Sequence, residues 1–528
     1  MPSSTRPPSA SPAGWRTPQW LAVVAILALG MGIGWRDRAP EVTAGGDEVT
    51  YLSLSHSLEH GQYRDEFIAG IPPHLHYPPG NPVWLLAIRK IAGPGLDLAR
   101  AANLILLALT AILIGDAVRR LTGPWVGVGA AAVVVLNVPL LEIAGTVLSE
   151  SLYIALATLS LWAALRTDEH QRRRWWIMAL GFGGAAFLTR TVGIVVLGGI
   201  LTWCLLRRRW SLAAASGLLS AGVVAGWISY LRLQGPSPLS TSYLADLAPY
   251  VDQTSPIAVI ARSAWRSLEF YVRYLPSSLR VPTLQGTPID NIAWYLVLAV
   301  CGGVGLWILL RRWPAAAVSL LLSCGVLLLW SWRIERLLLP LLPVGIAAIL
   351  VGAFGIARPL GSRAPTLIAT ALAGVISGSA LLALLQNPRW TACERTAPYE
   401  DPSCFNPNAT SLVRAAWVIR DRLPANAVIA TLEPAVVHYF SGRQTFPLPK
   451  ALELLDGATA QGTPPVVFTH LLTETVLESN TTAPVEMVRY CTALQVATPV
   501  EPPFFLFRVS GGPSGGDACY LWEHETEN

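Results

Sequence analysis

The sequence contains little charge. Of its 528 residues, 13% are charged and 52% are hydrophobic, and the mean hydropathy is +0.46. A soluble domain normally carries about 25% charged residues. Charge this sparse over this length excludes an ordinary soluble protein and indicates that lipid solvates most of the chain. The net charge is only +5, and no basic face interleaved with aromatic residues occurs, so nucleic-acid binding has little support.

Cysteine is also scarce, with seven residues. Three lie in apolar runs, where a thiol behaves as a small core residue: Cys204, Cys301 and Cys324. The other four lie in the polar C-terminal part, and an even number in a segment outside the cytoplasm indicates two disulfides. Proximity in the sequence favours the pairs Cys393–Cys404 and Cys491–Cys519. A zinc site is the alternative, although this part of the chain contains no C-x-x-C pair.

Long apolar runs are abundant. A run of about 20 residues crosses a hydrocarbon core of ~30 Å, and eleven runs approach that length: 20–35, 99–118, 124–141, 146–165, 175–189, 191–206, 211–231, 292–310, 314–332, 337–356 and 365–385. Arginine clusters fall at every second turn between them, which places the N-terminus in the cytoplasm by the positive-inside rule. Eleven spans then place the C-terminus outside, and the expected location is a bacterial inner membrane.

The runs 175–189 and 191–206 have a second interpretation, as one overlong helix. Arginine clusters stand at both ends of the pair, so a single helix would place one cluster on the outer side, against the rule. Two short spans that meet at Arg190 keep both clusters inside. Because each span is short, the turn should lie recessed from the outer surface, which predicts Arg190 at membrane depth.

The chain divides into three predicted parts. Residues 1–18 are rich in proline and serine, which is typical of a disordered tail, here cytoplasmic; a cleaved signal peptide is the alternative interpretation of the first run. Residues 19–386 form the membrane domain, with long outer loops at 36–98 and 232–290. Residues 387–528 alternate helical and β-rich segments. The predicted fold class is therefore a polytopic α-helical membrane protein with a small C-terminal periplasmic α/β domain.

Two adjacent acids, Asp47 and Glu48, follow the first span, and His74, His76 and Tyr77 follow them in a proline-framed loop. A carboxylate at the membrane–water boundary can act as a general base on an acceptor hydroxyl or amine. A loop acid is more often simply solvated. The acids nevertheless open a helix-like stretch beside this polar loop, which favours the functional interpretation.

Arg190, Arg333 and Arg336 are the cations predicted at the outer face. Arginine binds phosphate through two parallel hydrogen bonds, and a charge at membrane depth costs about 2.5–3.5 kcal/mol, so it is functional by default. Snorkelling from a helix end is the alternative for Arg333 and Arg336. Glu142 and Glu150 lie near the outer end of the fourth span. Either is a candidate second acid, with solvation the alternative for Glu142 and a structural hydrogen bond the alternative for Glu150.

The order of several short motifs resembles the GT-C superfamily of membrane glycosyltransferases. The similarity is greatest to the bacterial, family-39-like branch related to protein O-mannosyltransferases and to the aminoarabinose transferases of lipid A. It extends over nearly the whole chain after the N-terminal tail. The motifs that carry it are Asp47-Glu48 with Tyr51, Tyr77-Pro78-Pro79-Gly80-Asn81-Pro82, Leu148-Ser149-Glu150-Ser151-Leu152-Tyr153, Leu188-Thr189-Arg190, the segment 336–343, the segment 417–430 and His438-Tyr439-Phe440-Ser441-Gly442-Arg443.

This resemblance implies a concrete reaction. Such enzymes transfer a monosaccharide from a polyprenyl-phosphate carrier to an acceptor, invert the anomeric centre and use no nucleotide sugar. By the motif match, Asp47 is the general base, Glu48 is its partner or orients the acceptor, and Tyr51 contacts substrate. The acceptor is a lipid, a glycan or a protein at the outer face.

The chain departs from the aminoarabinose transferases in the first loop. Those enzymes carry a lysine near the proline motif, where this chain has Tyr77-Pro78. His74, His76 or an arginine from elsewhere is expected to take over the phosphate contact. No cofactor is required, although a divalent ion at the Asp47/Glu48 or the His74/His76 pair is compatible with the sequence.

Two other classes of function compete with the enzyme. A transporter or flippase of lipid-linked substrates would predict inverted repeats with broken helices. The sequence shows no such internal symmetry, and the large C-terminal part makes the two halves unequal. A non-catalytic membrane scaffold that binds partners through its soluble part is the third class.

Overall fold

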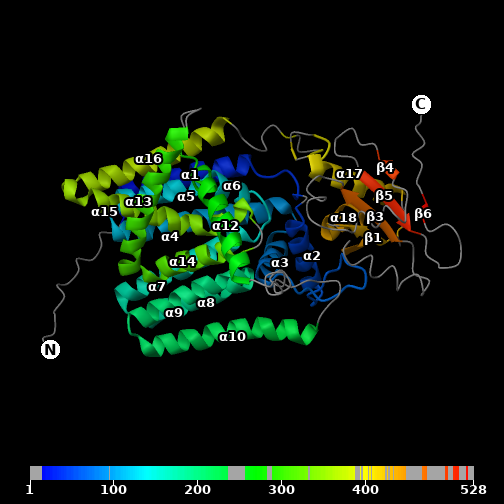
Figure 1. Ribbon diagram of the computed structural model, residues 1–528, viewed down its shortest axis with the longest axis horizontal. Coiled ribbons are helices and arrows are strands. Elements are labelled where there is room, and N and C mark those ends of the chain that lie inside the picture. Colours follow the sequence, from blue (N-terminus) through cyan, green and yellow to red (C-terminus); the bar gives the residue numbers. More distant parts are fainter. Residues whose placement is uncertain are drawn as a thin grey trace.

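The computed structural model describes residues 15–43, 45–93, 95–235, 256–281, 288–330 and 333–386, most of 393–447 and four later strands. Helices form a large body at one end of the molecule, and the strands gather at the other (Figure 1). The predicted disordered tail lies almost wholly outside the described residues.

Every apolar run singled out in the sequence contains helix. The helices are α1 (Thr17–Arg36), α2 (Asp47–Glu59), α3 (Gly80–Ala92), α4 (Leu96–Leu121), α5 (Pro124–Val135), α6 (Val138–Ala144), α7 (Glu150–His170), α8 (Arg173–Thr189), α9 (Ile194–Leu206), α10 (Trp210–Gln234), α12 (Pro256–Ser278), α13 (Pro288–Arg312), α14 (Pro314–Leu329), α15 (Leu342–Ala357) and α16 (Ala364–Gln386). In the described part of the chain, three 3₁₀ turns join them: η1 (Thr191–Gly193), η3 (Glu335–Leu341) and η4 (Arg358–Leu360).

Six of the described helices are long and apolar enough to cross a membrane: α1, α4, α10, α13, α15 with its flanking turns, and α16. A seventh span results if α5 and α6, which are bent by 56° relative to each other, are counted as one. This is the composition of a multi-pass membrane protein. The predicted count of eleven is not confirmed by the described residues, because α9 and α14 are short, α7 ends in a charged turn and α8 begins with two arginines.

The region 175–206 forms two helices, as the arginine pattern predicts. α8 ends at Thr189, the backbone of Arg190 is extended, and η1 leads directly into α9. Gly193 makes this turn tight, because a Cβ at this position would lie 2.4 Å from the backbone nitrogen of Phe187. The side chain of Arg190 is therefore presented from a compact turn between two packed helices.

The C-terminal part contains α17 (Pro407–Arg422) and α18 (Pro434–Ser441) with the strands β1 (Val428–Thr431), β2 (Gln444–Pro447), β3 (Val466–Leu471), β4 (Leu494–Val496), β5 (Phe504–Val509) and β6 (Cys519–Tyr520). The strand order is β2-β1-β3-β5-β4, and β6 pairs with β5. β1 is parallel to β2 and β3, whereas β5 is antiparallel to its neighbours. The segment containing the predicted domain boundary at 387 lies outside the described residues.

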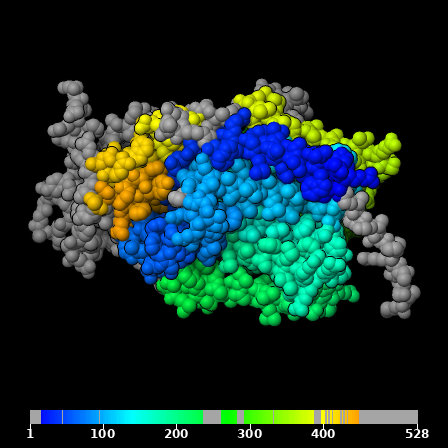
Figure 2. All heavy atoms as spheres, turned by 180° about the vertical axis from the view of Figure 1, so that it is seen from behind, coloured from blue at the N-terminus to red at the C-terminus, as the bar shows by residue number. Residues whose placement is uncertain are grey.

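This C-terminal part packs on the first loop, residues 36–98. Thr445 of β2 donates its backbone N–H to the carbonyl of Phe67 and pairs with Ile68. Val49, Phe67 and Ile68 share a buried apolar cluster with Tyr399, Val436 and other residues of the C-terminal part. In Figure 2 the atoms of α18 and β2 (orange) lie directly beside those of the first loop (blue). The loop that carries Asp47 is therefore held between the helical body and the sheet.

One of the two expected disulfides is confirmed. Cys393 and Cys404 are bonded, with their Cα atoms 4.8 Å apart, which leaves neither thiol for the alternative zinc site. The second expected pair is outside the described residues at Cys491, and only the backbone of Cys519 is described, in β6.

Candidate active site

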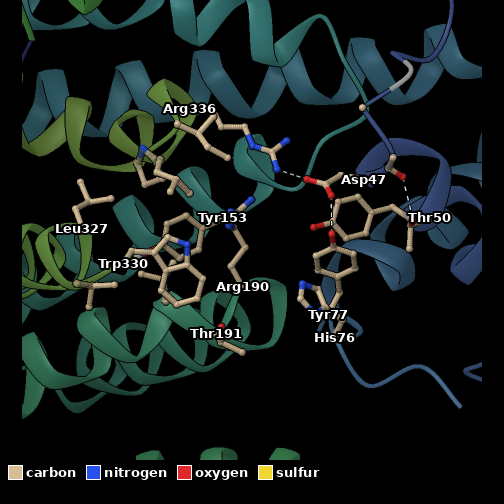
Figure 3. Close-up of a pocket in the computed structure, with 18 of the residues that line it drawn as sticks. Asp47, Thr50, His76, Tyr77, Tyr153, Arg190, Thr191, Leu327, Trp330 and Arg336 are labelled. Carbon is tan, nitrogen blue, oxygen red and sulfur yellow. Dashed lines mark hydrogen bonds and ion pairs between the residues drawn. The ribbon is translucent and has the colours of Figure 1, made fainter. Parts of the chain in front are cut away.

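A cavity of about 770 Å³ lies where the first loop, the α8–α9 turn, η3 and the start of α18 meet. Its polar side is formed by residues that are far apart in the sequence: Asp47, Tyr51, Tyr77, Arg190, Arg336 and Glu433. Its other side is apolar and comes from the α9, α14 and η3 region: Val192, Ile194, Val326, Leu327, Trp330 and Leu341. Figure 3 shows the charged groups facing one another across this space.

Asp47 lies at the first position of α2, where a carboxylate is favoured by the helix dipole. Gly46, with φ +77°, lets the chain turn into the helix so that Asp47 faces the cavity. The hydroxyl of Tyr77 donates to Asp47 Oδ1 at 2.5 Å, and Arg336 donates to Oδ2 (Figure 3). The predicted base therefore has a fixed orientation, with one partner from the first loop and one from η3.

Arg190 and Arg336 converge on Glu150, the first residue of α7. Arg190 Nη1 lies 2.7 Å from Glu150 Oε1, and Arg336 Nε lies 3.7 Å from the same oxygen. The Glu150 side chain is only 1% exposed, whereas that of Arg336 is 31% exposed. The two guanidiniums are thus balanced by two carboxylates, those of Asp47 and Glu150. The arginine side chains are more exposed than Glu150 and lie on the side of the cavity that a ligand can reach.

Ser149 links Arg190 to the packed side chains of Tyr51 and Tyr77. Its hydroxyl accepts from Arg190 Nη1 at 2.9 Å and lies 3.0 Å from the hydroxyl of Tyr51. The rings of Tyr51 and Tyr77 pack against each other with centroids 4.8 Å apart. Tyr51 therefore contributes to the cavity wall and to the position of the groups beside it.

The approach of α3 to α8 places the tyrosine loop next to the arginine turn. Gly80, the first residue of α3, lies so close to α8 that a Cβ would be 2.6 Å from the carbonyl oxygen of Leu188. Any larger residue would push Tyr77 away from Arg190. The glycine of the proline motif is therefore required by backbone packing at this position.

Glu48 does not line the cavity, contrary to the role expected for it. Successive residues of a helix point about 100° apart, so Glu48 faces the protein body when Asp47 faces the cavity. Its carboxylate is buried, accepts from the Thr43 hydroxyl at 2.6 Å and also accepts from the backbone N–H groups of Thr43 and Val147. Burial raises the pKa of this carboxyl. We interpret Glu48 as the group that ties α2 to the segment before α7.

His74 is likewise part of the loop framework and not of the cavity lining. Its Nδ1 lies 2.6 Å from Asp65 Oδ1, and its Nε2 accepts from the backbone N–H of Tyr77 at 2.8 Å. Both side chains of the Asp65–His74 pair are at most 4% exposed. His76 does line the cavity. His74 thus points into the protein and His76 toward the cavity. Asp47 and Glu48 likewise point in different directions. The two side chains of each pair are therefore not arranged to bind one ion together.

The two remaining predicted residues lie away from the cavity. Glu142 is part of α6 and does not line it. Arg333 is exposed and does not line it either, although Arg336, three residues further, does. Of the outer-face cations predicted from the sequence, Arg190 and Arg336 are therefore the two that the fold brings together.

Glu433 is a cavity residue that the sequence did not single out. It directly precedes α18, and its Oε2 would lie 2.7 Å from a Cβ at Gly46. Burial, and then the nearby charge of Asp47, raise the pKa of Glu433 to about 7. Near Glu433 the sequence shows only a Glu-Pro pair at the start of a helix, which does not indicate a site residue. Its contact with residue 46 is a consequence of how the C-terminal part packs on the first loop.

The raised pKa of Glu433 predicts a pH dependence of stability. An unfolded glutamate titrates near pH 4.5, whereas the folded protein keeps the proton on Glu433 up to about pH 7. The folded state therefore binds more protons between these values, so the free energy of unfolding falls as the pH rises through this window, by at most about 3 kcal/mol. Melting curves of the purified protein at pH 5, 6, 7 and 8 should show this fall in the wild type.

Glu433→Gln should remove most of the slope, because the amide does not titrate. Glu59→Gln is the matched control, since Glu59 is bound to Lys90 at the far end of α2, and this ion pair lowers its pKa. Its titration lies below the window. An unchanged slope in Glu433→Gln would contradict the assignment.

The family described as dolichyl-phosphate-mannose-protein mannosyltransferase matches residues 76–229, which include Tyr77, Glu150 and Arg190. No curated protein sequence gives a significant match to the chain. Solved structures are similar over far more of it.

The chain is similar to ArnT from Cupriavidus metallidurans bound to undecaprenyl phosphate, with a TM-score of 0.55, 14% identity and coverage of 93% of this chain and 98% of ArnT. The apo form of the same protein gives a TM-score of 0.57 at 13% identity, with the same coverage.

The chain is also similar to the archaeal oligosaccharyltransferase AglB from Archaeoglobus fulgidus, in complex with an inhibitory peptide and a dolichol-phosphate. The TM-score is 0.51 at 13% identity, over 86% of this chain and 70% of AglB. The resemblance carried by the short motifs is confirmed at the level of structure, because the chain shares its fold with ArnT and AglB.

Proposed function

We propose that the protein transfers a monosaccharide, a hexose or a pentose, from a polyprenyl-phosphate carrier to an acceptor at the outer face of the membrane. The observation that carries this proposal is the convergence of Asp47 with Arg190 and Arg336 in a cavity that has one apolar side. A lipid phosphate needs cations for its head and an apolar surface for its chain, and the two sides of the cavity supply both.

The proposed reaction uses each of these groups. An acceptor hydroxyl or amine attacks the anomeric carbon, and Asp47 takes its proton. The bond between that carbon and the phosphate oxygen breaks with inversion, and the leaving lipid phosphate carries the developing charge. Arg190 and Arg336 stabilise that charge, because preorganised donors act most strongly in a site that excludes water.

The cavity adds two details to this mechanism. Arg336 is bound to Asp47, so a phosphate that takes over Arg336 also releases the base for the acceptor. The apolar wall from η1 to η3 suits the first prenyl units. The ligands in the two similar structures, an undecaprenyl phosphate in ArnT and a dolichol-phosphate in AglB, are of this chemical class.

The location belongs to the same proposal. We place Asp47 and the C-terminal part outside the cytoplasm of a bacterial cell, in keeping with the arginine clusters at every second turn. The acceptor, a lipid, glycan or protein, would approach between the first loop and α18, where Glu433 and His76 line the cavity.

A transfer assay separates the three classes of function. The full-length protein in detergent or nanodiscs is incubated with polyprenyl-phosphate sugars that carry a radiolabel on the sugar. An enzyme moves the label to an acceptor or releases it to water. A flippase or scaffold leaves the sugar–phosphate bond intact, and an unbroken bond with every hexosyl and pentosyl donor would refute the proposal.

A further inference from the structure

A group of metal-ligating side chains lies outside the cavity, at the far end of α2. His56 and His60 are four residues apart on this helix, and Glu66 follows in the first loop. One nitrogen or oxygen ligand atom from each residue lies within 4.8 Å of the other two. At 1.5 Å per residue, His56 and His60 lie roughly 14 Å and 20 Å from Asp47 along the helix axis.

The hydrogen bonds of both imidazoles fix their tautomers. His60 Nδ1 lies 3.1 Å from the carbonyl oxygen of His56, and His56 Nδ1 lies 2.9 Å from Glu66 Oε2. Both partners are acceptors, so in each neutral ring the proton is on Nδ1 and the lone pair is on Nε2. Metal-binding histidines are held in this way, with the second nitrogen donating to a carbonyl or a carboxylate.

The geometry suits a divalent transition metal. Two histidines at positions i and i+4 on a helix present their Nε2 atoms on one face, which is the spacing used by zinc sites of the H-E-x-x-H type. A tetrahedral zinc ion places its ligand atoms roughly 3.4 Å apart. Both rings are exposed, that of His56 to 51%, and their centroids lie 4.7 Å apart. Rotation of the side chains can therefore turn both Nε2 atoms toward one ion, and water would complete the coordination.

We propose that His56 and His60 bind a zinc-class divalent ion through Nε2, with Glu66 orienting the ring of His56. The ion would brace the first loop, whose residues His76 and Tyr77 line the cavity. Glu66 is next to Asp65, which holds His74, and His74 in turn accepts from the backbone of Tyr77. Tyr77 donates to Asp47. An ion that holds Glu66 in place would therefore also restrain the residues that position Asp47.

Zinc binding to the full-length protein tests this directly and needs no activity. The protein is purified with a tag that contains no histidine, treated with EDTA, and titrated with zinc chloride by calorimetry. We expect one ion per chain in the wild type, and loss of that ion in His56→Ala and His60→Ala. Glu66→Gln should weaken binding by about 10- to 100-fold, as for other outer-shell carboxylates.

His170→Ala is the control, because this exposed histidine is at the end of α7 and belongs to neither site. Zinc should raise the melting temperature of the wild type and of His170→Ala but not of His60→Ala. His60→Gln repeats the test with a smaller change if the alanine variant melts differently without zinc. Equal zinc stoichiometry in the wild type and in both His56 and His60 variants, or no binding by the wild type, would overturn the proposal.

Discussion

Asp47→Asn should reduce sugar transfer by about 10²- to 10⁴-fold, the usual contribution of a positioned general base. The amide is the same size and still accepts a hydrogen bond from Tyr77, so the cavity should keep its shape. It cannot take the acceptor's proton. Initial rates with a radiolabelled polyprenyl-phosphate sugar, normalised to protein in the membrane, measure the effect.

The control for this variant is Glu59→Gln, which neutralises an acid at the other end of the same helix, where Glu59 is paired with Arg89 and Lys90. It should transfer at the wild-type rate. Donor binding should survive in Asp47→Asn, because the variant leaves both arginines in place. Full transfer activity in Asp47→Asn, at a normal melting temperature, would show that another group takes the proton.

The helices were predictable because each is encoded by its own run of residues. Apolar stretches of 15 to 25 residues indicate helices wherever they occur, and the arginine clusters at both ends of 175–206 reveal that this region is two helices, α8 and α9. The number of spans was less predictable. α7 and α8 are apolar along most of their length but carry charges at one end, and no local pattern sets how deeply such a helix lies.

The sequence motifs indicated which residues belong near the candidate site, but not always which way their side chains point. Asp47, Tyr77 and Arg190, which were predicted as site residues, line the cavity. Glu48 and His74 share those motifs but point into the protein, because helix rotation and the bond to Asp65 set their directions. Glu433 was not foreseen, because its contact with Gly46 joins segments almost 400 residues apart, and tertiary packing alone creates it.

Arg190→Ala is expected to damage both stability and transfer, through different partners. It leaves the carboxylate of Glu150 buried without its 2.7 Å partner. Breaking a buried pair costs about 3–5 kcal/mol, and we expect about 3 kcal/mol here because Arg336 remains 3.7 Å away. Transfer should fall by about 10²- to 10³-fold, the usual effect of removing one charge-stabilising donor.

Combining this variant with Glu150→Gln separates the two effects. The double variant should regain most of the lost melting temperature, since no buried carboxylate is left unpaired, but it should not regain transfer, since the phosphate still lacks a guanidinium. Arg333→Ala is the control, because this exposed arginine does not line the cavity.

Glu150→Gln alone decides between the two roles that the sequence allowed for this acid. A second proton-transferring acid would be worth about 10²- to 10⁴-fold in rate, whereas a counter-charge that only balances Arg190 and Arg336 should leave transfer within roughly tenfold of the wild type. We expect the second result, because the Glu150 side chain is 1% exposed and lies behind the arginines. Loss of transfer in Glu150→Gln with unchanged donor binding would instead move Glu150 into the reaction itself.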